Sequence, residues 1–227
     1  MKIAIHQPNY LPWIGYFDKM DQVDTFVILD TANHSKSGYI NRTKIKTPQG
    51  SLVLTVPLKQ KEKPINELEI ENNVNWPTRH WKAIEANYKK CPYWADYKDG
   101  FEKIYSDKWD KIASLNIALI KHLAMLLTIT TKIVVESDFQ LDFGHNNARN
   151  VNIVSHLGGD IYLSGIGARV YNDESAFHDR HIKLIYQDFK HPEYPQRFRN
   201  FHYNLSILDM LFNCGPDTME IIRQQRR

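Results

Sequence analysis

The sequence has 227 residues, of which 42% are hydrophobic and 12% aromatic, enough for one large domain with its own buried core. Its 29 Lys and Arg against 26 Asp and Glu give a net charge of +3, too even a balance for a nucleic-acid-binding surface. Only two cysteines occur, Cys91 and Cys214, so we expect neither a disulfide framework nor a zinc ribbon, and we expect a cytoplasmic protein. The most apolar window, residues 115–135, contains Lys121 and His122, so no membrane span is expected.

Apolar runs alternate with helical patterns along the chain. Ile14, Phe17, Met20 and Val23 recur at three-residue steps and predict a helix, as does the pattern within 146–159. The predicted strands are 2–5, 25–30, 132–137, 160–165 and 182–187. Strands separated by helices predict an α/β fold: a Rossmann-like parallel sheet with helices on both faces, in a single domain over residues 1–227.

Two segments interrupt this alternation. Residues 37–59 alternate apolar and polar side chains around "PQG" and predict a β-hairpin, to which 65–70 would add a third strand, so the β-hairpin insertion spans 37–70. Residues 76–127 predict three helices, the first beginning with Thr78 as its cap.

Ligands of parallel sheets bind beyond the carboxyl ends of the strands, so the loops there are the first candidates for a site. His6 and Gln7 are candidate catalytic groups, and Tyr10 and Trp13 are candidate stacking surfaces. The candidate residues at strand ends are His6, Gln7, Asn9, Tyr10, Trp13, Asp30, Ser164, Gly165 and Tyr171. Each also has a structural alternative: a turn hydrogen bond for His6, Gln7 or Asn9, and cover of a core edge for the aromatic rings.

The predicted hairpin carries a basic row. Alternation places Arg42, Lys44 and Lys46 on one face of a strand, next to Asn41. Such a row suits a diphosphate, or it is the solvated face of the strand. We expect the hairpin and the end of the first strand to face one pocket that contains both His6 and Arg42.

Six segments in chain order resemble the WbqC-like family of bacterial proteins: "IHQPNYLPWIGYFDKM", "NRTKIK", "LTVPLK", "YLSGIGARVY", "PEYPQRF" and "LSILDMLFNCG". The resemblance runs from about Ile5 to about Gly215. It implies surface-polysaccharide (O-antigen) gene clusters, in which amino sugars are acylated, and it singles out Gln196, Ser206 and Asp209. The residues alone predict Ser206 as a helix N-cap and Asp209 as an acidic group in the first turn.

A more distant resemblance is to HIGH-type nucleotidyltransferases and pantothenate-synthetase-like ligases. "WIGY" lies where the His-x-Gly-His motif would fall, and this resemblance implies that Gly15 lets a nucleotide approach the backbone. Trp13 and Tyr16 replace both histidines, so His6, His34 or the basic hairpin would have to stabilise charge on the phosphate.

These patterns together favour an enzyme that transfers an amino-acid or other acyl group to the amine of a nucleotide-linked amino sugar. Such a ligation would use ATP with Mg²⁺. A nucleotidyltransferase acting on a sugar phosphate and a non-catalytic sugar-nucleotide-binding protein are the alternatives, and a homo-oligomer is compatible with each. "HDRH" (178–181) has metal-ligand spacing but no third ligand, so no metal site is expected.

Overall fold

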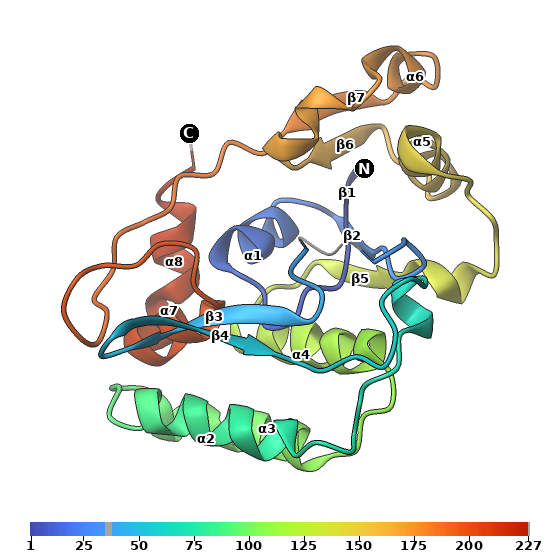
Figure 1. Cartoon of the computed structure of the whole chain (residues 1–227). Helices are drawn as coiled ribbons and strands as arrows, with labels where there is room; N and C mark the ends of the chain where they lie inside the picture. Colours follow the sequence, from blue (N-terminus) through green and yellow to red (C-terminus); the bar gives the residue numbers. More distant parts are fainter. Residues whose placement is uncertain (35–37, 227) are drawn as a thin grey trace.

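The structure, a computed structural model, describes residues 1–34 and 38–226. Figure 1 shows its central sheet, which contains five parallel strands in the order β5-β2-β1-β6-β7. These strands are β1 (Lys2–His6), β2 (Thr25–Ile28), β5 (Lys132–Val135), β6 (Ile161–Ser164) and β7 (Lys183–Tyr186). The predicted parallel sheet is confirmed.

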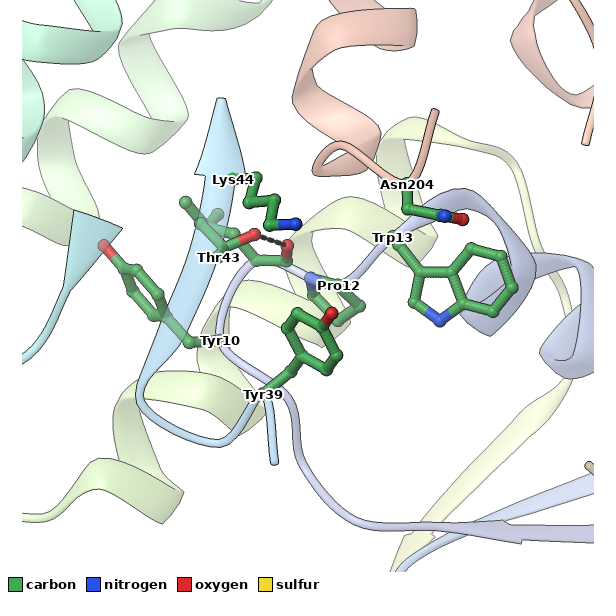
Figure 2. Close-up of a pocket in the computed structure, with 8 residues that line it drawn as sticks. Tyr10, Pro12, Trp13, Tyr39, Thr43, Lys44 and Asn204 are labelled. Atoms are coloured by element: carbon green, nitrogen blue, oxygen red, sulfur yellow. Dashed lines mark hydrogen bonds between the residues drawn. The ribbon is translucent and has the colours of Figure 1, made fainter. Parts of the chain in front are cut away.

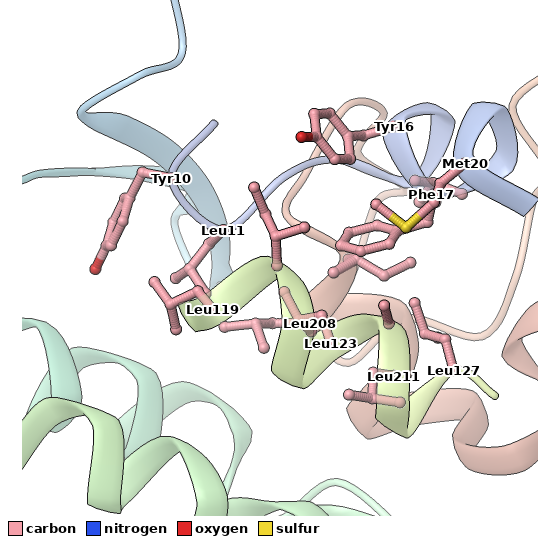
Figure 3. Packing of buried hydrophobic residues seen from close by; sticks show 14 of the residues in the cluster. Tyr10, Leu11, Tyr16, Phe17, Met20, Leu119, Leu123, Leu127, Leu208 and Leu211 are labelled. Carbon is pink, nitrogen blue, oxygen red and sulfur yellow. The ribbon is translucent and has the colours of Figure 1, made fainter. Parts of the chain in front are cut away.

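Alternation along each strand divides the core into two layers. Ala4 and Phe26 face a large cluster that includes α1 (Ile14–Asp21), α4 (Ile112–Leu126) and α7 (Ile207–Cys214). Figure 3 shows leucines of α4 and α7 packed beneath Phe17 and Met20 of α1. On the other face, Ile3, Ile5 and Val27 pack against α5 (Asn146–His156) and α6 (Glu174–His178). Helices therefore cover both faces of the sheet, as predicted.

The hairpin forms, but it stays a two-stranded sheet separate from the central one. Strands β3 (Arg42–Thr47) and β4 (Gly50–Thr55) pair antiparallel around the predicted turn. Residue 37, the first of the predicted insertion, lies outside the described residues. The expected third strand is wrong: residues Ile65–Glu67 form a 3₁₀ turn, η1, and Ile70 makes an isolated bridge with Leu58.

Three helices follow the hairpin, as predicted: α2 (Trp76–Tyr88), α3 (Trp94–Ser106) and α4. The prediction of Thr78 as cap was wrong, because α2 begins two residues earlier and Asn75 is its N-cap. Proline at the second residue is compatible with this start, since the first turn of a helix needs no backbone N–H donor. The remaining elements are η2 (Glu136–Phe139), η3 (Ile166–Val170), η4 (Gly215–Asp217) and α8 (Thr218–Arg223).

None of the helices in the described part of the chain is long and apolar enough to cross a membrane.

Candidate active site at the carboxyl edge of the sheet

The order of the strands locates a crevice. In chain order the sheet reads third, second, first, fourth, fifth strand, so the winding reverses between β1 and β6. Loops that leave such neighbouring strands in opposite directions open a gap at their carboxyl ends. His6 ends β1 and Ser164 ends β6, and both line a cleft at this point.

The cleft has two lobes. The first encloses about 490 Å³ and the second, over the start of α5, about 640 Å³. The lobes share Gln7, Leu29, Asn150 and Tyr171, so they form one continuous groove. The structure brings seven of the predicted site residues to the first lobe: His6, Gln7, Trp13, Gly15, Ser164, Gly165 and Tyr171.

His6 is held as a neutral ring. Its Nδ1 lies 3.1 Å from the carbonyl oxygen of Gln7, and because a carbonyl only accepts, Nδ1 donates and Nε2 keeps the lone pair. Burial and, to a lesser extent, the neighbouring Lys19 amine lower the pKa of His6 from 6.5 to about 3. At neutral pH the ring therefore offers a hydrogen-bond acceptor and has no proton to give as an acid.

Lys19 of α1 lies beside His6 in the same lobe. Its side chain is buried, and its Nζ donates to the carbonyl oxygen of Ile5 at 3.1 Å. Burial lowers the pKa of Lys19 from 10.5 to about 7.

The indole of Trp13 covers Gly15. A Cβ on Gly15 would lie 2.3 Å from Cη2 of Trp13, so only glycine fits under the ring. The indole also contacts Phe189 edge to face, with ring centroids 5.3 Å apart. The space through which a nucleotide would approach the Gly15 backbone is thus filled by Trp13 itself.

The loop after β6 leaves open space. Ser164 is buried, and its Oγ accepts a hydrogen bond from Nδ2 of Asn172 at 3.0 Å. A Cβ on Gly165 or Gly167 would meet nothing within 4 Å, so these glycines border the cleft without being crowded. Tyr171 stands at the rim with 70% of its surface exposed.

A second, mostly apolar pocket of about 240 Å³ is also lined by Trp13. Figure 2 shows Pro12, Trp13 and Tyr39 around it, with the Lys44 amine and the Asn204 amide at its upper side. The Tyr10 hydroxyl points away from this pocket and forms hydrogen bonds with His80 Nδ1, at 2.8 Å, and with the Tyr105 hydroxyl. Tyr10 therefore contributes a ring wall to this pocket, and Asn9 is buried and lines neither it nor the cleft.

The expected common pocket for His6 and Arg42 does not form. Arg42 lines a further cavity with Tyr39, Thr43, Lys44 and Val53, and its Nε donates to the Gly38 carbonyl oxygen at 3.2 Å. Asn41 is buried and donates to the carbonyl oxygen of Val56 at 2.9 Å, which ties the start of β3 to the end of β4.

Asp30 joins two strand ends instead of lining the cleft. Its carboxylate accepts from the Ser137 hydroxyl at 2.7 Å and from the Ser137 backbone N–H at 3.1 Å. Burial raises its pKa, while the hydrogen bonds from Ser137 oppose this shift. The contact fixes the end of β2 to η2.

Gln196, Ser206 and Asp209 form part of a separate buried network. Ser206 caps α7 by accepting from the Leu208 backbone N–H at 3.3 Å, and Asp209 lies in the first turn, as predicted. Gln196 Oε1 accepts from Lys46 Nζ at 2.7 Å, which takes Lys46 out of the solvent. Burial raises the pKa of Asp209 to about 6, while the hydroxyl of Tyr194, which donates to its carboxylate at 3.0 Å, acts in the opposite direction.

Residues 1–34 and 38–226 contain no group of three or more His, Cys, Asp or Glu side chains able to hold a metal ion.

Several cleft residues were not identified from the sequence. Lys19 follows Gly15 by four residues and so shares its helical face, a signal that could have indicated it. Gln187 directly follows β7, and the strand-end rule could have found it. Asn150 and Arg149 lie on α5, where only the folded arrangement brings them to the second lobe.

Comparison with known proteins identifies the chain. The sequence model of the WbqC-like protein family matches residues 7–221. The chain belongs to the WbqC-like family.

This WbqC-like chain is 34% identical over 231 residues to a protein of Mycobacterium tuberculosis (strain ATCC 25618 / H37Rv) named "Uncharacterized protein Rv1507c". The similarity covers 100% of the chain and 99% of that protein. No solved structure matches the chain.

Proposed function

We propose that this WbqC-like protein is an enzyme of surface-polysaccharide biosynthesis that transfers an amino-acid or other acyl group to the amine of a nucleotide-linked amino sugar. One observation carries the proposal: a polar cleft at the strand switch point and an apolar pocket share the side chain of Trp13. A transfer reaction needs two neighbouring substrate sites, and these two cavities differ in polarity as a sugar nucleotide and an acyl group do.

The cleft suits the nucleotide sugar. Its two lobes form a long groove, and amide or hydroxyl groups of Gln7, Asn150 and Ser164 line it. Small residues at Gly165 and Gly167 leave room for phosphate or sugar close to the backbone. The smaller pocket beyond Trp13 would take the acyl group, with Lys44 and Asn204 at its polar side.

In this scheme His6 orients the attacking amine. Its free Nε2 accepts a hydrogen bond from an amine N–H, which directs the nitrogen lone pair toward the acyl carbon. The N–C bond forms as the bond between the acyl carbon and its AMP leaving group breaks. Because the pKa of His6 is about 3, the ring acts only as a hydrogen-bond acceptor, and the amine proton leaves with the AMP phosphate or to water. Gln7 would fix the sugar hydroxyls from the same loop.

An assay of turnover tests the proposal. The purified protein is incubated with a UDP- or dTDP-linked amino sugar, an acyl donor and ATP with Mg²⁺, and the amide product is detected by mass spectrometry. We expect AMP to be released only when amine and acid are both present. Release of pyrophosphate with a sugar phosphate would indicate nucleotidyl transfer instead, and binding without turnover would indicate a sugar-nucleotide-binding protein.

A matched pair of variants locates the site. His6→Ala should lower turnover roughly 10²- to 10⁴-fold with little change in ligand affinity, because its interaction matters most in the transition state. His178→Ala changes an exposed imidazole away from the cleft and should retain wild-type turnover. Full activity of His6→Ala would contradict the role of this loop.

A further inference from the structure

Lys19 is a buried amine with one hydrogen bond. Its side chain is 3% exposed and lies in the floor of the first lobe. An ammonium has three N–H donors, and the carbonyl oxygen of Ile5 accepts one of them. The described residues supply no acceptor for the other two, and Lys19 lines the cleft.

No carboxylate of the described chain pairs with Lys19. Its neighbour Asp18 is fully buried and accepts from Arg226 Nε at 2.8 Å and from Gln187 Nε2 at 2.6 Å. Asp and Glu oxygens of residues 1–34 and 38–226 all lie more than 4.0 Å from the Lys19 amine. His6, the titratable group facing it from β1, is uncharged at neutral pH.

The cleft as a whole is depleted of negative charge. Neither lobe has an Asp or Glu among its described lining residues. Arg149 in the second lobe is neutralised by Glu136, with N–O distances of 2.6 and 2.7 Å. Lys19 is therefore the cation of this cleft that lacks a carboxylate partner, and a buried charge of this kind is costly until an anion joins it.

We propose that Lys19 is the ion-pair partner of a phosphate group of the ligand that occupies the cleft. The inference rests on the proposed function only in taking the cleft as the ligand site. A lysine acts as a point charge that suits a tetrahedral phosphate, whereas planar carboxylates are matched best by the fork of an arginine. The glycine-containing loop after β6 lines the same lobe as Lys19, and its glycines are uncrowded.

Binding should then be coupled to proton uptake. Burial lowers the pKa of Lys19 to about 7, and a phosphate beside it would raise that pKa again. At pH 8 the free amine is mostly neutral, so each ligand should bring in about 0.9 proton, and below pH 6 almost none. His6 contributes nothing at pH 8, since its pKa is far lower.

Calorimetric titration with UDP-N-acetylglucosamine tests this, because that probe has no group of its own titrating between pH 6 and 8. The binding enthalpy is measured at pH 8 in buffers of different ionisation enthalpy, and the slope gives the protons taken up. Lys19→Met should lose the uptake and bind roughly 10- to 100-fold more weakly. Lys183→Met, at the amino end of β7 on the opposite edge of the sheet, should behave as wild type.

Folding is checked in the same samples. Lys19→Met removes a buried charge, so its melting temperature should be equal to or above that of wild type, and Lys19→Gln is the second variant if Lys19→Met does not fold. Unchanged affinity and proton uptake in a folded Lys19 variant would overturn the proposal while leaving the proposed function intact.

Two further probes separate the outcomes. If UDP-N-acetylglucosamine does not bind but inorganic pyrophosphate binds in a Lys19-dependent way, the phosphate site is supported and the nucleotide-sugar function fails. If malonate binds in place of pyrophosphate, or if neither phosphate compound binds, Lys19 is not a phosphate partner.

Discussion

At the scale of single residues, two neighbouring basic groups of the cleft are kept largely out of water without a carboxylate between them. The His6 ring donates from Nδ1 to a carbonyl, and the Lys19 amine does the same from Nζ. Burial favours the neutral form of both groups, so their pKa values fall. These two groups therefore carry little charge above pH 7, and an anion that enters the cleft should raise the pKa of Lys19.

The low pKa of His6 predicts a pH dependence of stability. An unfolded imidazole binds a proton below pH 6.5, whereas the folded one does so only near pH 3, so the free energy of unfolding contributed here falls as the pH drops from 6.5 toward 3. The slope is at most about 1.4 kcal/mol per pH unit. His6→Asn should show a shallower decline than wild type in urea unfolding at pH 7, 5 and 4.

The pH dependence of unfolding must be compared between wild type and His6→Asn, because other groups titrate in the same pH range. The raised pKa of Asp209, about 6, makes folding more favourable as the pH falls through that window, in both proteins alike. His178→Asn, a change at an exposed imidazole, is the control. Parallel curves for wild type and His6→Asn would show that His6 is not held neutral by the fold.

At the scale of elements, the segment from β1 to α1 combines a site wall with a packing constraint. Trp13 is the N-cap residue of α1 and carries the indole that lies over Gly15 in the first turn. Gly15 also accepts a hydrogen bond from Gln187 through its carbonyl oxygen at 2.9 Å, which links α1 to the residue after β7. The position of the indole between the cleft and the apolar pocket thus depends on a glycine two residues further on.

Gly15→Ala should displace this indole. The added Cβ would lie 2.3 Å from the ring, so we expect a loss of about 1 to 3 kcal/mol of stability and a changed tryptophan emission spectrum. Gly167→Ala is the matched control, because its Cβ would meet no atom within 4 Å and its melting temperature should stay close to that of wild type. Because Trp13→Ala removes the indole, the Gly15→Ala substitution should cost less stability in a Trp13→Ala protein than in wild type. Strictly additive losses of stability in the double variant would contradict a clash between the Cβ and the indole.

At the scale of the whole molecule, the C-terminal segment closes onto the helix that carries Lys19. Arg223 and Arg226 pair with Asp21 and Asp18, with N–O distances from 2.6 to 2.8 Å. These pairs join residues about two hundred positions apart. The C-terminal segment thus neutralises Asp18, the carboxylate that precedes Lys19 in the sequence.

Arg226→Met should therefore destabilise the fold more than a surface substitution does. It would leave the fully buried Asp18 carboxylate with only the amides of Gln22 and Gln187, and because Arg226 is partly exposed we expect a loss of roughly 2 kcal/mol, seen as a melting temperature about 4 to 8 °C lower. Lys108→Met breaks an exposed pair with Asp110 at 3.7 Å and should shift the melting temperature little. Equal effects of the two substitutions in calorimetric melts would contradict a structural role for the chain end.

Short-range patterns were enough to predict most of the architecture. Short apolar runs separated by helical patterns predicted the five parallel strands, three-residue steps predicted the helix after β1, and alternation predicted the hairpin. Each pattern reflects how one segment faces its neighbours within a few residues. The strand-end rule also predicted that His6 and Ser164 would meet. Predictions of element boundaries failed in two places: α2 begins before Thr78, and residues 65–70 form a 3₁₀ turn and two isolated bridges instead of a strand.

What the sequence by itself determined was the class of fold and the loops that meet at its carboxyl edge. The tertiary structure alone decided which polar groups share a cavity: Arg42 lies apart from His6, Gln196 accepts from Lys46, and Lys19 lines the cleft with no carboxylate of the described residues in ion-pair contact. The reason is physical. The direction of a strand or helix depends on residues close in the chain, whereas burial and ion pairing depend on groups that only the completed fold brings within a few ångströms.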